Sequence, residues 1–547
     1  MCTSIRKKNR NNTLLNKWKK LLVQFIRCIV IGIHYIFDCV VDLMFGLFYD
    51  CRVKKVPGAK NDLLLESATS LAEKIRTKQV TAEKVVTSFI ERCKEVNGLI
   101  NAIVEERYAD AIEEAKAVDI ELQGYEDTSF LKETRPFLGV PFTTKESNEA
   151  KGLLHTMGMI RRRNHRSTSD ATVVSNLKNA GGILIAKTNI PELNLWVESR
   201  NKLYGQTCNP YNTTRTVGGS SGGEGAITAA CGSALSIGSD IGGSTRMPAF
   251  YNGVFGMKPS EGMTSLKGIG LRDKYYPTSM AEAGPICKKA EDLAPFLKVL
   301  VGDKVSKLKL DEPVNLENLN IFYQLESGDI RASKVCRSMR SAFKKAVDHF
   351  EEITHSTTKI KIPGSEYSFR LWRYWMSQED TDFKADITNR EYRASAISEI
   401  RKFVTGTSKI TFAALLKLID EDLLPKENPE WAISVTNRMK KYLLEILNEN
   451  GVLFYPSSPF PAIYHYSSFL RPYNFGYWCL FNVLKFPVCQ VPLGLDYEGI
   501  PVGIQVVAAP YNDHLCIAVA KELERAFGGW VPPSELFKFE LNFHISL

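Results

Sequence analysis

The chain has 547 residues, of which 44% are hydrophobic and 24% are charged, a balance that indicates a globular protein with a sizeable core and excludes a disordered or collagen-like chain. The formal net charge is +9, but seven basic residues lie in the first twenty positions, where there is no acidic residue. The rest of the chain is nearly neutral, so we expect no nucleic-acid-binding surface.

Cysteine and histidine give no sign of a metal site. The twelve cysteines form no CxxC pair, and the eight histidines form no HExxH motif and no Cys/His cluster. We interpret the cysteines as small buried apolar residues. Neither a metal ion nor another cofactor is expected.

An apolar segment at 21–49 follows the basic tail at 1–20. As a helix it would be about 43 Å long, more than the ~30 Å of a bilayer core. Within it, four polar residues fall on one helical stripe, which suits a helix lying in the interface or packing that stripe on a partner. They are Arg27, His34, Asp38 and Asp42.

Two kinds of membrane attachment therefore stay open for 21–49, a transmembrane helix and an interfacial helix. A buried helix of the soluble body is the less favoured alternative. We predict a single-pass or monotopic protein of an intracellular membrane. Basic residues flank the segment on both sides, so they leave the membrane side of the main body open.

Residues 60–540 are predicted to form the catalytic domain, because short apolar runs alternate with helical patterns, as in an α/β enzyme. The region from about 365 to 445 is helical and charged, and suits a cap over the sheet. We expect two helices within 62–96, the second with Thr81 as N-cap, and further helices at 107–122, 170–180 and 333–350. The expected strands are 137–143, 183–186, 319–323, 452–455 and 488–491.

The segment 216–259 is rich in glycine and serine. A phosphate-binding loop is disfavoured, because Glu224 stands where lysine and a hydroxyl residue should follow the glycines. A flexible linker is disfavoured by interleaved apolar residues such as Ile227 and Leu235. The remaining interpretation is a serine nucleophile, Ser244, in a nest of backbone amides. These amides, the predicted oxyanion hole, belong to Ile241, Gly242, Gly243 and Ser244.

Three motifs then resemble the amidase signature family: GVPFTTK ending at Lys145, GGSSGGEG containing Ser220, and DIGGSTR containing Ser244. Further landmarks follow in family order, such as GVFGMKP at 253–259 and PVGIQ at 501–505, and the resemblance runs from about 60 to 535. It implies an α/β fold with a large mixed β-sheet flanked by helices on both faces, preceded here by the N-terminal membrane helix.

The resemblance also implies the roles of the residues. Ser244 is the nucleophile, Ser220 relays its proton and Lys145 is the base, while Ser221, Asp240 and Arg246 support the loop. A lysine base must be neutral, so its pKa must fall from about 10.4 to about 7, which costs about 4–5 kcal/mol of burial. The alternatives are a solvated Lys145 and a Ser220 that only caps the helix at 223–231.

Within the family, the apolar N-terminal segment and the stretches 481–495 and 512–530 resemble the fatty-acid amide hydrolase branch. The expected substrate is a lipophilic amide, such as a long-chain fatty-acid amide, and a homodimer is reasonable. The rivals are an amidotransferase of the same family and an inactive membrane-tethered scaffold. Three residues depart from the family pattern: Val217 replaces a proline, Thr245 an aliphatic residue and Lys485 a glycine.

Overall fold

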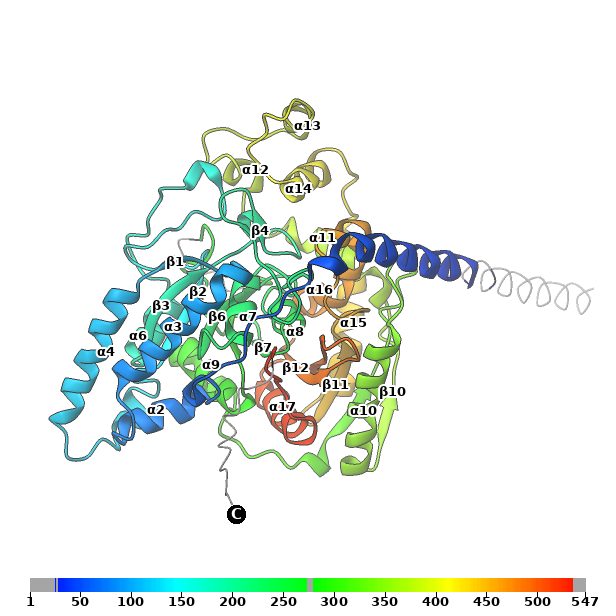
Figure 1. The fold of residues 1–547 in the computed structure, drawn as a ribbon. Coiled ribbons are helices and arrows are strands. Elements are labelled where there is room, and N and C mark those ends of the chain that lie inside the picture. Colours follow the sequence, from blue (N-terminus) through cyan, green and yellow to red (C-terminus); the bar gives the residue numbers. More distant parts are fainter. Residues whose placement is uncertain (1–24, 26–27, 273–278, 535–547) are drawn as a thin grey trace, which may run out of the picture.

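The computed structural model describes residue 25 and residues 28–272 and 279–534. Within these residues the centre is an eleven-stranded mixed sheet in the order β1-β3-β2-β6-β8-β7-β12-β13-β11-β9-β10 (Figure 1). The strands are β1 Ile103–Glu106, β2 Pro141–Lys145, β3 Ile183–Thr188, β6 Leu235–Asp240, β7 Phe255–Lys258, β8 Glu282–Cys287, β9 Asn320–Tyr323, β10 Thr357–Lys359, β11 Gly451–Pro456, β12 Val488–Leu495 and β13 Pro501–Ala508. A separate small pair consists of β4 Arg200–Asn201 and β5 Gly205–Gln206.

Helices flank this sheet on both faces, as predicted (Figure 1). They are α2 Ala68–Arg76, α3 Ala82–Ile100, α4 Tyr108–Gln123, α5 Leu131–Thr134, α6 Thr172–Asn179, α7 Gly222–Ala229, α8 Arg246–Tyr251, α9 Leu293–Val301, α10 Arg337–Thr354, α11 Ser368–Met376, α12 Phe383–Asp386, α13 Ala396–Val404, α14 Phe412–Asp422, α15 Pro429–Leu447, α16 Gly476–Leu484 and α17 Asp513–Phe527. Thr81 caps α3 as expected, since its side chain accepts a hydrogen bond from Lys84 N.

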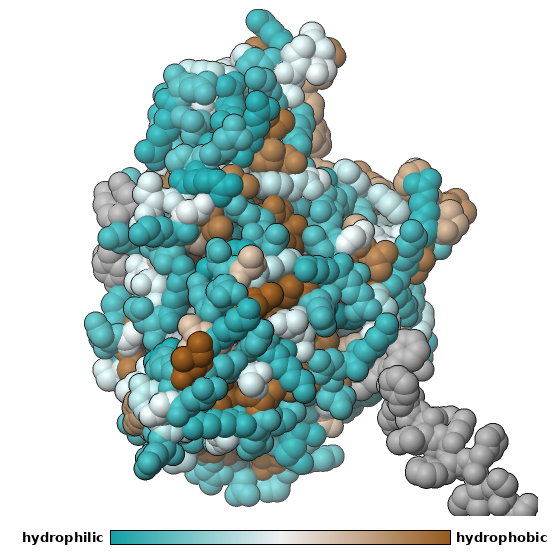
Figure 2. Space-filling model, turned by 60° about the vertical axis from the view of Figure 1, so that its left-hand side comes forward, coloured by the Kyte–Doolittle hydropathy of each residue, from teal (hydrophilic) through white to brown (hydrophobic). Residues whose placement is uncertain are grey.

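Two apolar clusters fill the molecule. The large one lies between the sheet and its helices. The small one joins a lobe at residues 383–422, which contributes Phe383 and Leu418 among others, to Met157, Met159 and Leu193 of the main body. This lobe carries α12 to α14 and stands at the top of the molecule, with a largely hydrophilic surface on the side that Figure 2 shows. It lies within the helical region for which a cap was predicted.

Backbone conformation decides where strand β2 begins and where helix α16 ends. The strand expected at 137–143 begins only at Pro141, because the chain turns at Gly139, whose φ is +76°. Lys485 ends α16 in the left-handed region, with φ +66°, which glycine adopts at least cost. The departure at Lys485 therefore replaces the residue type that this backbone favours.

The N-terminal helix runs from Cys28 to Arg52, is long and apolar enough to cross a membrane, and projects beyond the body (Figure 1). Its polar stripe faces the body, where Asp38 and Asp42 form ion pairs with Arg471. The opposite face is exposed, so this is not a buried core helix. The predicted tail at 1–20 and Arg27 of the stripe lie outside the described residues.

Candidate active site

Three neighbouring segments form the site. Strand β2 ends at Lys145, and β6 runs parallel beside it and ends at Asp240. Because parallel strands end at the same edge of a sheet, Lys145 and the loop after Asp240 come together there. The glycine-rich segment before α7 brings Ser220 to the same edge.

Lys145 has the environment that a neutral lysine needs. It is fully buried, and its Nζ donates hydrogen bonds to Ser220 Oγ at 2.6 Å and to Ser239 Oγ at 3.0 Å. Burial lowers the pKa of Lys145 to about 7, although the nearby Asp240 and Glu224 carboxylates oppose this shift. The alternative of a solvated surface lysine is therefore wrong.

Ser220 contacts the lysine, whereas the neighbouring Ser221 lies at the start of helix α7. Ser220 Oγ accepts the lysine hydrogen bond, whereas the N-cap of α7 is Ser221, with no side-chain capping bond. The capping alternative for Ser220 is therefore wrong. Ser221 N donates to Ser244 O at 3.1 Å, which ties the glycine-rich segment to the nucleophile loop at 240–246.

Ser244 is half-buried and lines a cavity of about 970 Å³ that Ser220 and Ser239 also line. Within the part of the chain that the structure describes, its hydroxyl has no hydrogen-bond partner. The structure thus brings Ser244 to one cavity with Ser220, which accepts the hydrogen bond from Lys145, and it shows no direct Ser220–Ser244 bond. Such bonds commonly tighten only when substrate is bound.

Asp240 and Arg246 form a buried ion pair that holds the nucleophile loop in place. Both side chains are fully buried, and Arg246 Nε lies 3.0 Å from Asp240 Oδ2. Burial alone would raise the pKa of Asp240, but the Arg246 charge and hydrogen bonds from Arg246 and Asn482 hold it well below its usual range. Arg246 also donates to Asn482 Oδ1 at 2.6 Å and to Gln505 Oε1 at 2.5 Å.

The four predicted oxyanion-hole amides are not equivalent. Gly243 N donates to Asp240 Oδ1 at 2.7 Å, so this amide holds the loop together. The amides of Ile241, Gly242 and Ser244 are left as candidates for binding an oxyanion. Gly242 has no room for a side chain, since a Cβ there would lie 2.6 Å from Phe475 Cζ.

Two polar residues beneath Lys145 were missed by the sequence reasoning. Ser239 accepts a hydrogen bond from the lysine, and Glu224 accepts from Thr143 Oγ1 at 2.5 Å and from Thr188 Oγ1 at 2.7 Å. Burial raises the pKa of Glu224 to about 7, against the lowering effect of these bonds and of Lys145. The only available signals were Glu224 within the GGSSGGEG motif and Ser239 beside Asp240.

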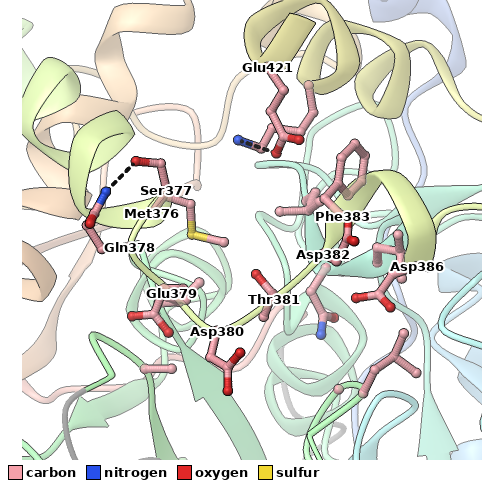
Figure 3. Close-up of a pocket in the computed structure, with 18 of the residues that line it drawn as sticks. Met376, Ser377, Gln378, Glu379, Asp380, Thr381, Asp382, Phe383, Asp386 and Glu421 are labelled. Carbon is pink, nitrogen blue, oxygen red and sulfur yellow. Dashed lines mark hydrogen bonds and ion pairs between the residues drawn. The ribbon is translucent and has the colours of Figure 1, made fainter. Parts of the chain in front are cut away.

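The cavity lining combines apolar and charged side chains. Apolar side chains such as Met157, Leu193, Ile241 and Met376 contribute to its lining. Charged side chains come from segment 376–386 and from α14, as Figure 3 shows with Glu379, Asp380, Asp382 and Glu421. The described residues contain no group of three or more side chains that could hold a metal ion.

Comparisons with known proteins show the family to which the chain belongs. The family model described as Amidase matches residues 84–517. The chain is 42% identical to fatty-acid amide hydrolase 2 of Homo sapiens, over 86% of this chain and 91% of that protein. It is 40% identical to fatty-acid amide hydrolase 2-A of Danio rerio, over 88% and 92%.

A solved structure of fatty acid amide hydrolase shares the fold, with a TM-score of 0.69 and 20% identity, over 86% of each chain. This chain therefore belongs to the amidase family. The predicted family, fold class and enzyme class are confirmed.

Proposed function

We propose that this chain is a serine amidase that hydrolyses long-chain fatty-acid amides to the acid and the amine, with Ser244 as nucleophile, Ser220 as relay and Lys145 as base. One observation carries the proposal. A fully buried lysine, with its pKa lowered to about 7, lies 2.6 Å from Ser220 Oγ in the cavity that contains Ser244. The chain in which it lies is 42% identical to a fatty-acid amide hydrolase.

Acylation transfers one proton in two steps. Ser244 Oγ attacks the amide carbonyl carbon and gives its proton to Ser220 Oγ, while Ser220 gives its own proton to neutral Lys145. The oxyanion is stabilised by loop amides, for which Ile241, Gly242 and Ser244 are the candidates. The C–N bond then breaks as Ser220 protonates the leaving nitrogen and regains a proton from Lys145, so the amine leaves neutral.

Deacylation uses the same groups in the reverse direction. Water enters after the amine has left and attacks the acyl carbon, while Ser220 and Lys145 take its proton. The second tetrahedral intermediate collapses by breaking the bond to Ser244 Oγ, which is reprotonated through Ser220. No redox step and no co-reactant other than water is required.

Apolar side chains in the cavity lining, among them Met157, Leu193 and Met376, offer contacts to an acyl chain. Each methylene group that leaves water contributes about 0.8 kcal/mol. Long-chain amides also partition strongly into bilayers, and the N-terminal helix offers an apolar outer face for membrane attachment, with Ile36 and Leu43 each 63% exposed and Leu47 79% exposed. We propose single-pass or monotopic attachment through this helix, to an intracellular membrane.

The same proposal divides the chain into three parts. They are a basic tail at 1–20, a membrane helix at 21–49 and a catalytic domain at 60–540. A homodimer stays a prediction supported by the resemblance, and the mass of the detergent-solubilised protein by light scattering would test it.

The rival functions are less well supported. An amidotransferase would act on a nucleic-acid-bound acid, and the nearly neutral main body gives no reason to expect such a partner. An inactive scaffold would have no need for a lysine held neutral by burial, because burying that side chain is unfavourable for folding.

Covalent labelling by a fluorophosphonate tests the nucleophile. Wild type should be labelled and should hydrolyse an oleoyl amide faster, in kcat/KM, than an acetyl amide. Ser244→Ala should lose both labelling and turnover, whereas Ser338→Ala on the remote helix α10 should retain both. Full labelling of Ser244→Ala would place the nucleophile elsewhere, and a preference for the acetyl amide would refute the lipid substrate.

A further inference from the structure

The N-terminal helix and the nucleophile loop contact the same short stretch of chain, residues 471–482, which we call the connecting segment. It contains Arg471, the 3-10 helix η10 (Pro472–Phe475) and most of α16. Arg471 faces the N-terminal helix, while Phe475, four positions later, faces the loop. A displacement at one end therefore has a short covalent path to the other.

At the helix end, Arg471 satisfies both carboxylates of the polar stripe. Its Nε donates to Asp38 Oδ1 at 2.8 Å, its Nη2 donates to Asp38 O at 2.8 Å, and Nη2 also lies 2.8 Å from Asp42 Oδ1. The side chains of Arg471 and Asp38 are 1% and 6% exposed. Removal of one partner from such a buried pair leaves an uncompensated charge, which is strongly unfavourable.

Ser333 adds a second link between the N-terminal helix and the connecting segment. Its hydroxyl donates to Asp38 Oδ1 at 3.1 Å, and its backbone N donates to Asn474 Oδ1 at 2.8 Å. Asn474 Nδ2 donates in turn to Ser333 Oγ at 3.1 Å. The helix is thus joined to the connecting segment by a polar network as well as by the ion pairs of Arg471 with Asp38 and Asp42.

At the loop end, three residues on one face of the connecting segment hold the nucleophile loop. Phe475, Trp478 and Asn482 follow the spacing i, i+3, i+7 of a helical face. Phe475 and Trp478 lie so close to Gly242 and Gly243 that a Cβ on either glycine would fall 2.6 Å from a ring or side-chain carbon. Asn482 Nδ2 donates to Asp240 Oδ1 at 2.9 Å.

We propose that the Asp38–Arg471 ion pair is a positioning contact for catalysis. When the N-terminal helix is bound to Arg471, the ion pair restricts the position of the connecting segment. The connecting segment in turn restricts the positions of the backbone amides beside Ser244. The inference rests on the proposed role of Ser244 as nucleophile. It makes the N-terminal helix part of the catalytic apparatus, so that even a small water-soluble amide is hydrolysed at full rate only when the helix is seated.

The test uses the full chain in detergent micelles and a short-chain water-soluble amide, so that membrane binding plays no part. Arg471→Met keeps a flexible, unbranched side chain and removes the guanidinium group with its charge. We expect kcat per titrated active site to fall by about tenfold with KM nearly unchanged, since small displacements of reacting groups cost at least this much. The rate of fluorophosphonate labelling should fall in parallel.

A matched control breaks another contact of the same helix. Tyr464→Phe removes the 2.6 Å hydrogen bond from Tyr464 OH to Asp50 Oδ1, which does not involve the connecting segment. We expect this variant to keep wild-type kcat. Arg471→Lys retains a charge and should recover part of the lost rate.

A double-mutant cycle tests whether the two partners act together. Asp38→Asn should lower kcat by itself and should add nothing to Arg471→Met. The proposal is overturned if Arg471→Met keeps wild-type kcat, if its loss disappears after active-site titration, or if the two substitutions are additive. Absence of hydrolysis and labelling in the wild type would instead refute the proposed function.

Discussion

The nucleophile loop and the N-terminal helix each bury a carboxylate against an arginine, in different surroundings. At the loop, Asp240 and Arg246 are both fully buried and share further bonds with Asn482 and Gln505. At the helix, Asp38 and Arg471 are nearly as well buried, but the helix around them is mostly exposed. The Asp240–Arg246 pair is therefore part of a dense core, whereas the Asp38–Arg471 pair is a main point of attachment between the helix and the body.

The largest expected effect comes from neutralising the aspartate in the loop. Asp240→Asn leaves the Arg246 charge buried without its counter-ion, so we expect the free energy of unfolding to fall by about 3–5 kcal/mol and activity to be lost with it. The matched change in the helix region is Asp50→Asn, an exposed carboxylate whose bond to Tyr464 is worth about 1 kcal/mol. Urea denaturation of both variants measures the difference, and equal losses would contradict it.

An intermediate effect should appear in the pH dependence of stability. Burial lowers the pKa of Lys145 to about 7, below the value of 10.5 for an exposed lysine, so the unfolded state binds the additional proton between these values. Wild-type stability should therefore rise by about 2 kcal/mol from pH 7 to pH 9 relative to Lys145→Met.

This effect can be followed by urea denaturation at fixed pH. Lys145→Met should also lose amide hydrolysis more severely than ester hydrolysis, since an alkoxide leaves without much protonation. A constant stability difference across this pH range would mean that Lys145 is not neutral in the folded protein.

The smallest effect on stability is expected on the outer face of the N-terminal helix. Leu43→Asn and Leu47→Asn alter exposed side chains, so unfolding free energies should stay within about 0.5 kcal/mol of wild type. Binding to lipid vesicles should weaken, because each leucine contributes about 1.5–3 kcal/mol when it leaves water. Co-sedimentation with vesicles provides the measurement, and unchanged binding by the double variant would exclude this face as the membrane contact.

Much of the sheet around the candidate site could be predicted from the sequence, because apolar runs bounded by turn residues mark buried strands. Strands β3, β9, β11 and β12 overlap their predicted ranges, and Lys145 ends its strand. The turn at Gly139 was missed because the apolar run masks it. Ser239 was missed because its contact with Lys145 depends on the pairing of β2 with β6, which no local pattern reveals.

The polar stripe of the N-terminal helix also shows that a local pattern does not reveal which distant residue it contacts. Its spacing predicts a polar face and suggests a partner, and the structure supplies one from this chain itself. That partner, Arg471, is 433 positions away from Asp38. Local periodicity cannot identify a contact of such sequence separation, since it depends on how the whole sheet brings the two segments together.

The small apolar cluster beneath the lobe at 383–422 has a consequence for protein engineering. The lobe supplies part of the wall of the substrate cavity, including Phe383 and Glu421. The cluster also contains Met157, Met159 and Leu193 of the main body, so lobe and body share this core. A chimaera that exchanges the lobe between relatives would therefore replace part of the cavity wall, and it should exchange these three body residues as well to keep the shared core packed.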